Sequence, residues 1–162
     1  MLITKNLSDT LSEAIRLCHD SIDPERRVEE HGGWIVQKDD EFKFFFLRND
    51  NAGTPQANVL FLANQQDVGK GPLTAMAKEG WKNYATFHTH PQFSVTPSSL
   101  DWNQMFQCCP YNFIYSPATL QLGVSHYLGR SDTDDGQKWE QNVFDVVYGA
   151  FVPAKRIRQV TL

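Results

Sequence analysis

Hydrophobic and polar residues follow two different periods in the first third of the chain, and these predict a helix and then strands. Over residues 7–22 the apolar side chains recur every three or four positions, which predicts an amphipathic helix that a following Asp-Pro pair ends. Stretches 32–38 and 41–49 are rich in aromatic and β-branched residues. They predict two strands joined by a turn at residues 39–40.

The middle of the chain alternates apolar runs with polar, glycine-containing segments. The apolar run 57–63 predicts a central strand, and the polar segment 64–80 predicts a loop or a loop with a short helix. Residues 83–88 predict another strand, which places His88 at its C-terminal end. Residues 98–107 predict a further helix.

The last third of the chain predicts two strands, a helix and a basic terminus. Residues 112–116 and 122–128 read as strands. Apolar residues at helical spacing predict a last helix over residues 137–148; they are Trp139, Val143, Val146 and Val147. The basic cluster at residues 153–159 is interpreted as a solvated terminus rather than a binding patch.

This interleaving of strands and helices predicts an α/β fold, with a mixed central β-sheet flanked by helices. The chain has 162 residues and shows neither an internal repeat nor a linker, which favours a single domain over residues 1–162.

Composition and charge narrow the classes of partner. A net charge of −4 provides no electrostatic footprint for nucleic acid or an acidic membrane. No apolar run approaches the ~20 residues that span a bilayer, and the N-terminus lacks a signal-peptide core. Three cysteines without disulfide spacing favour reduced thiols and a cytoplasmic location, although export without a cleaved signal would leave the same pattern.

Candidate chemistry begins with two histidines one residue apart, His88 and His90. Side chains at i and i+2 of a strand point to the same side, so both imidazoles can face one point at the strand's end. Pro91 limits the strand there. Zinc sites that catalyse reactions use three protein ligands and a water, and two histidines with a carboxylate are one standard set.

A Ser-x-x-Asp follows, formed by Ser98 and Asp101. Asp101 would supply the carboxylate if the intervening loop folds back over the strand end. The alternative is structural, because Ser-x-x-Asp before a helix is also a capping box worth about 1 kcal/mol. A histidine at a strand end is likewise usually just hydrogen-bonded.

A further carboxylate that could act as a base stands upstream. Glu29 and Glu30 precede two adjacent glycines at the start of the first expected strand. Adjacent glycines there suggest either close packing against another backbone or a bend at the start of the strand. We interpret Glu29 as a surface residue and Glu30 as the candidate base, although their adjacency leaves the choice between the two open.

Together these residues resemble the JAB/MPN metalloproteases that carry the JAMM motif. That pattern is Glu-x-x-Gly with apolar residues, then His-x-His-Pro, about seven residues, and Ser-x-x-Asp. Here "EHGGWI" from Glu30 is followed by "HTHP" from His88 and by "SSLD" ending at Asp101, in the same order and spacing. The form "TPSSLDW" looks like that of small prokaryotic members.

The resemblance implies a JAB/MPN-type fold and a zinc metallo-isopeptidase or peptidase. It implies zinc on His88, His90 and Asp101, a zinc-bound water activated by Glu30, and an oxyanion contact from Ser98. It further implies cleavage at the C-terminal tail of a ubiquitin-like or sulfur-carrier protein.

Two other functions stay open at this point. The same motif would occur in a JAB-like effector or toxin module used in bacterial competition, and in a JAB/MPN scaffold without catalysis. Scaffolds of this kind usually lose a ligand, and none is missing here. The sequence specifies neither the substrate nor the oligomeric state.

Overall fold

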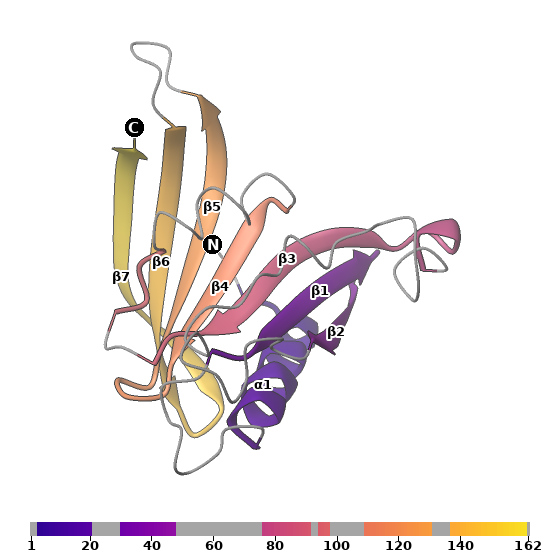
Figure 1. Ribbon diagram of the computed structural model, residues 1–162, viewed down its shortest axis with the longest axis horizontal. Helices are drawn as coiled ribbons and strands as arrows, with labels where there is room; N and C mark the ends of the chain where they lie inside the picture. The colour runs from indigo at the N-terminus through magenta and orange to yellow at the C-terminus, as the bar shows by residue number, and fades with distance from the viewer. Residues whose placement is uncertain are drawn as a thin grey trace.

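The computed structural model describes residues 3–20, 30–47, 76–91, 94–97, 109–130 and 137–161. Within these ranges one long helix packs on a single twisted sheet of seven strands (Figure 1). The helix is α1 (Lys5–Asp20). The strands are β1 (Gly32–Lys38), β2 (Glu41–Leu47), β3 (Lys82–Thr89), β4 (Tyr111–Ser116), β5 (Gln121–Arg130), β6 (Gln137–Val147) and β7 (Ala150–Thr161).

The sheet is mixed, as the sequence predicts. Its strand order is β2-β1-β3-β4-β5-β6-β7. All pairs of neighbours except β1 and β3 are therefore consecutive strands of the described chain. Only β3 and β4 pair in parallel; the other five described connections between neighbours are antiparallel. The described part is richer in strands than an arrangement flanked by helices, since α1 is its one helix longer than a single turn.

Helix α1 forms because its apolar residues line one stripe, and that stripe is buried against the sheet. The backbone N–H of Ser8 donates to the Thr4 carbonyl at 2.8 Å and starts the helical ladder. Buried residues of α1 join side chains of β1 and β3–β6 in one core; from the helix these are Leu7, Leu11, Ala14 and Cys18. We call the side of the sheet that carries this core the α1 face.

The thiol of Cys18 in this core predicts a loss of stability in alkali. Burial raises its pKa from 9.0 to about 12. As pH rises above 9 the unfolded thiol loses its proton while the native one keeps it, so deprotonation favours unfolding. Between pH 8 and pH 10 this costs on the order of 1 kcal/mol. In Cys18→Ala we expect the free energy of urea unfolding to fall less over that interval than in the wild type; an equal fall would contradict the assignment.

The strand predictions for the described parts hold, and the β1–β2 turn forms at residues 39–40 as expected. Asp39 takes a positive φ of 52° in that turn, a conformation that aspartate tolerates better than most residues. The expected strand 57–63, most of the segment 64–80 and the expected helix 98–107 lie outside the described residues.

The prediction of a helix over residues 137–148 is wrong. This segment is strand β6, paired with β5 on one side and β7 on the other. Both faces of β6 are covered at its centre: Val143 packs against Val95 and Ile114, whereas Phe144 belongs to the core under α1. With apolar residues needed on both faces, the alternation typical of a strand is lost, and the helical spacing is a coincidence.

The interpretation of residues 153–159 as a solvated terminus is also wrong in part. They belong to β7, which pairs with β6 along its length and forms one edge of the sheet. Their basic side chains at Lys155 and Arg156 are nevertheless exposed. No helix in the described part of the chain is long and apolar enough to cross a membrane.

Candidate metal centre

His88 lies inside the molecule, on the face of the sheet opposite α1. In β3 it alternates with Phe87, which belongs to the core under α1. It pairs directly with Gly32 of β1 on one side and Ile114 of β4 on the other. Because Gly32 has no side chain, the imidazole is not crowded from β1. His88 is fully buried, with 0% of its surface exposed.

His90 follows the end of β3 and faces the same space. Its backbone N–H donates to the Tyr115 carbonyl of β4 at 2.9 Å, which extends the parallel β3–β4 pairing past the last strand residue. The ring centroids of His88 and His90 are 4.8 Å apart, and the rings are inclined by 66°. The expectation that the two imidazoles face one point is therefore confirmed.

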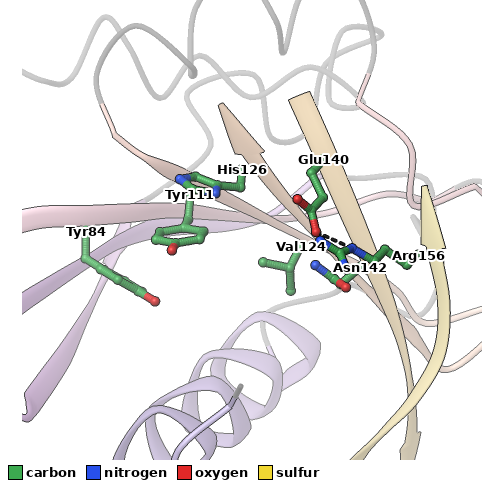
Figure 2. Close-up of a pocket in the computed structure, with 7 residues that line it drawn as sticks. All are labelled: Tyr84, Tyr111, Val124, His126, Glu140, Asn142 and Arg156. Atoms are coloured by element: carbon green, nitrogen blue, oxygen red, sulfur yellow. Dashed lines mark hydrogen bonds and ion pairs between the residues drawn. The ribbon is translucent and has the colours of Figure 1, made fainter. Parts of the chain in front are cut away.

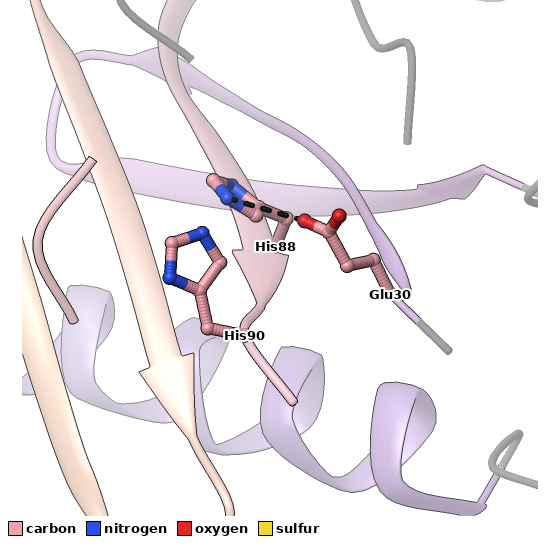
Figure 3. A group of neighbouring side chains, drawn as sticks. All are labelled: Glu30, His88 and His90. Atoms are coloured by element: carbon pink, nitrogen blue, oxygen red, sulfur yellow. Dashed lines mark ion pairs between the residues drawn. The ribbon is translucent and has the colours of Figure 1, made fainter. Parts of the chain in front are cut away.

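Glu30 reaches this pair from the residues that lead into β1. Its Oε1 lies 3.7 Å from Nε2 of His88, and Figure 3 shows the carboxylate directed at that ring. Glu30 is only 9% exposed. A carboxylate that is buried to this extent is costly unless positive charge or hydrogen-bond donors are close to it.

Thr89 helps to bring Glu30 there. The Thr89 N–H donates to the His31 carbonyl at 2.8 Å, and the Thr89 hydroxyl accepts the N–H of His31 at 3.0 Å. These bonds attach the residue after Glu30 to the residue between the two histidines. In the sequence, Thr89 has no signal other than its place inside the His-x-His pair.

The donor atoms of Glu30, His88 and His90 all lie within 4.8 Å of one another. In the part of the chain that the structure describes, no other group of three or more histidine, cysteine or acidic side chains converges in this way. The cluster joins a carboxylate from the start of β1 to two imidazoles from the end of β3.

The sequence profile described as prokaryotic homologs of the JAB domain matches residues 21–148. The chain belongs to the prokaryotic JAB-domain family. No curated protein matches it significantly. A protein from Desulfitobacterium hafniense with a structure determined in solution is similar to it at 15% sequence identity and a TM-score of 0.49. That alignment covers 91% of this chain and 86% of the other.

The donor set of this JAB domain suits zinc. Nitrogen from histidine and oxygen from a carboxylate are zinc's usual ligands after thiolate, at about 2 Å. Tetrahedral ligands at that distance stand roughly 3.4 Å apart. The donor atoms of Glu30, His88 and His90 lie up to 4.8 Å apart. Rotation of the side chains can close the difference between the two distances. Two buried imidazoles beside a buried, negatively charged carboxylate therefore fit a divalent cation.

The remaining predicted site residues lie outside the described part of the JAB domain. These are Ser98, Asp101 and Glu29. Of the predicted ligands the structure thus brings together His88 and His90, and it adds Glu30 beside them. The assignment of Asp101 as third ligand and of Ser98 as oxyanion donor stays a prediction.

A cleft of about 340 Å³ lies on the α1 face of the sheet (Figure 2). The ring of His126 stacks on Tyr111 there, with centroids 4.5 Å apart. Arg156 of β7 forms an ion pair with Glu140 of the neighbouring strand β6, and the hydrogen bond between them raises the pKa of the guanidinium. The sheet separates this cleft from His88, so it takes no part in the metal centre.

Proposed function

We propose that this JAB domain is a zinc-dependent metallopeptidase that cleaves peptide or isopeptide bonds at the C-terminal tail of a ubiquitin-like or sulfur-carrier protein. The observation that carries the proposal is the convergence of Glu30 with His88 and His90 in a member of this family. A structural histidine pair would need no buried carboxylate beside it.

His88 and His90 would hold the ion, and Asp101 would complete the ligand set. A bound zinc would lower the pKa of its water to about 7 and polarise the carbonyl of the scissile bond. The buried position of His88 and His90 excludes bulk solvent from the side of the sheet. Each electrostatic interaction at the site is stronger for that reason.

Glu30 would act as general base and then as general acid. Its carboxylate would take a proton from the attacking water and pass it to the nitrogen of the leaving amine, so that the carboxylate is restored at the end of each cycle. Ser98 would donate a hydrogen bond to the oxygen of the tetrahedral intermediate, a contact worth about 3 kcal/mol in comparable sites.

The substrate proposal follows the motif and the compact chain. Only a short connection, residues 107–112, follows the motif's expected helix, without the longer insertion that eukaryotic deubiquitinating relatives of this motif use. An extended C-terminal tail could reach a site at a strand end by lying alongside the sheet. A protein partner with such a tail is therefore the class of substrate we propose.

Metal analysis tests the ligand set. We expect the purified protein to hold about one zinc per chain and Asp101→Ala, prepared identically, to lose it, because Glu30 would serve as the base rather than as a ligand and two histidine ligands alone bind zinc weakly. Asp9→Ala, on the exposed surface of α1, is the matched control and should keep its zinc. Mass spectrometry of the native proteins gives the metal content directly.

Two results would change the proposal. Absence of zinc from all three proteins, even after zinc is supplied, would exclude the enzyme. Full zinc content in Asp101→Ala would mean that another carboxylate is the third ligand. Glu30 would then be the candidate, because it lies beside the two histidines.

A further inference from the structure

The segment at residues 94–97, between the histidine pair and Ser98, is bound to a buried glutamine of β6. Gln141 is 1% exposed, and its Nε2 donates to the Val95 carbonyl at 2.9 Å. The same amide lies 3.4 Å from the Ser125 hydroxyl of β5. The Val95 side chain is itself buried against Ile114 and Val143. A loop segment is thus attached to the sheet by the hydrogen bond from Gln141 and by the packing of Val95.

Gly123 of β5 makes this approach possible. A Cβ atom at that position would lie 2.7 Å from the Val95 carbonyl oxygen and 2.9 Å from Nε2 of Gln141. Real side chains do not tolerate such contacts with backbone, so only glycine allows the segment to reach the amide. Two residues on neighbouring strands, Gly123 and Gln141, therefore determine where the segment lies.

The segment in turn determines the orientation of His90. Nδ1 of His90 lies 3.0 Å from the carbonyl oxygen of Ser94, the residue before Val95. A carbonyl oxygen only accepts hydrogen bonds, so Nδ1 carries the proton and the lone pair of the neutral ring is on Nε2. Metal-binding histidines commonly have their second nitrogen held by a carbonyl in this way.

We propose that Gln141 is a positioning residue for His90. By holding the Val95 carbonyl it keeps the adjacent Ser94 carbonyl against Nδ1 of His90, and this directs Nε2 of His90 toward the space that it shares with His88 and Glu30. The proposal rests on the zinc site of the proposed function, because positioning matters only if His90 is a ligand. It does not require that the protein be a peptidase.

The tautomer of His90 in the metal-free protein provides a test independent of zinc and of activity. Long-range proton–nitrogen spectra at alkaline pH, where imidazoles are neutral, should show His90 protonated on Nδ1 in the wild type. In Gln141→Met, which keeps the length of the side chain but removes its donor, we expect a clear population of the Nε2-protonated form. Gln121→Met is the matched control, since Gln121 of β5 donates its hydrogen bond to Asp145 of β6, at 3.1 Å, and not to the segment.

Metal affinity provides the second readout. Competition with a chelator should show that zinc binds Gln141→Met roughly tenfold or more weakly, whereas Gln121→Met binds it like the wild type. If Gln141→Met does not fold, Gly123→Ala takes its place. It retains the glutamine but displaces the Val95 carbonyl, and the same change of tautomer is expected.

The outcomes separate this proposal from the proposed function. An unchanged His90 tautomer and unchanged zinc affinity in a folded Gln141→Met, or an unchanged tautomer in Gly123→Ala, would overturn the role of Gln141. A wild type that binds zinc tightly but cleaves nothing would contradict the peptidase and leave the role of Gln141 intact.

Discussion

Replacing Glu30 by glutamine is expected to reduce peptide-bond cleavage by two to four orders of magnitude while the protein keeps its zinc. Glutamine has the shape of glutamate but cannot take up a proton at neutral pH, so proton transfer to the leaving amine is lost. The carboxylate's place beside His88 makes Glu30 the described residue best situated for this role. The measurement is release of a fluorescent amine from the C-terminal glycine of ubiquitin and of bacterial ubiquitin-like proteins, with zinc content determined on the same samples.

The control for this experiment is Glu13→Gln, which makes the same change on the exposed side of α1 and should leave cleavage unaltered. Loss of both cleavage and zinc in Glu30→Gln would make Glu30 a ligand rather than the base. Full cleavage by Glu30→Gln on a substrate that the wild type hydrolyses would contradict the mechanism.

Gly33→Ala is expected to destabilise the protein by about 3 kcal/mol or more. A Cβ at this position would lie 1.9 Å from the Phe45 carbonyl oxygen and 2.8 Å from its carbon, both in the backbone of β2. Relief requires β1 and β2 to separate, because backbone atoms within a paired strand cannot rotate away. Gly33 is also two residues from His31, so the separation would disturb the approach of Glu30. Chemical unfolding measures the loss.

The comparison for Gly33 is Gly149→Ala in the turn between β6 and β7. Gly149 has a positive φ of 78°, but no atom lies within 4 Å of a Cβ added there. Its substitution should cost only about 1 kcal/mol, from backbone conformation alone. Equal effects of the two substitutions would show that the close approach of β2 to Gly33 is unimportant.

Local patterns predicted the helix and most of the described strands. Helix α1 buries a single stripe of apolar residues, so its period is visible in the sequence. Strands β1 and β2 carry the β-branched and aromatic residues that favour a sheet, and a two-residue turn joins them. The adjacent glycines indicated close packing of backbone, and the contact between Gly33 and β2 confirms it.

Strand β6 shows how a local pattern can mislead when apolar residues stand on both faces of a strand. Its inward positions on the face opposite α1 are Trp139, Gln141 and Val143, and one of these is polar. Nothing in the sequence marks Gln141 as buried, because its environment is made by Ser125 and by the Val95 carbonyl, which are distant along the chain. The residue that we propose to position His90 was missed for this reason.

The sequence by itself determined the family, because the spacing of the motif can be read directly from the chain. It also determined that His88 and His90 point to the same side, because side chains two residues apart in a strand do so. Only the tertiary structure decided that Glu30 meets them. That meeting depends on β1 and β3 being neighbours, with Gly32 opposite His88 and Thr89 bonded to His31. Such pairing joins segments far apart in the chain, and its free energy comes from contacts of the whole sheet rather than from the preferences of any short stretch.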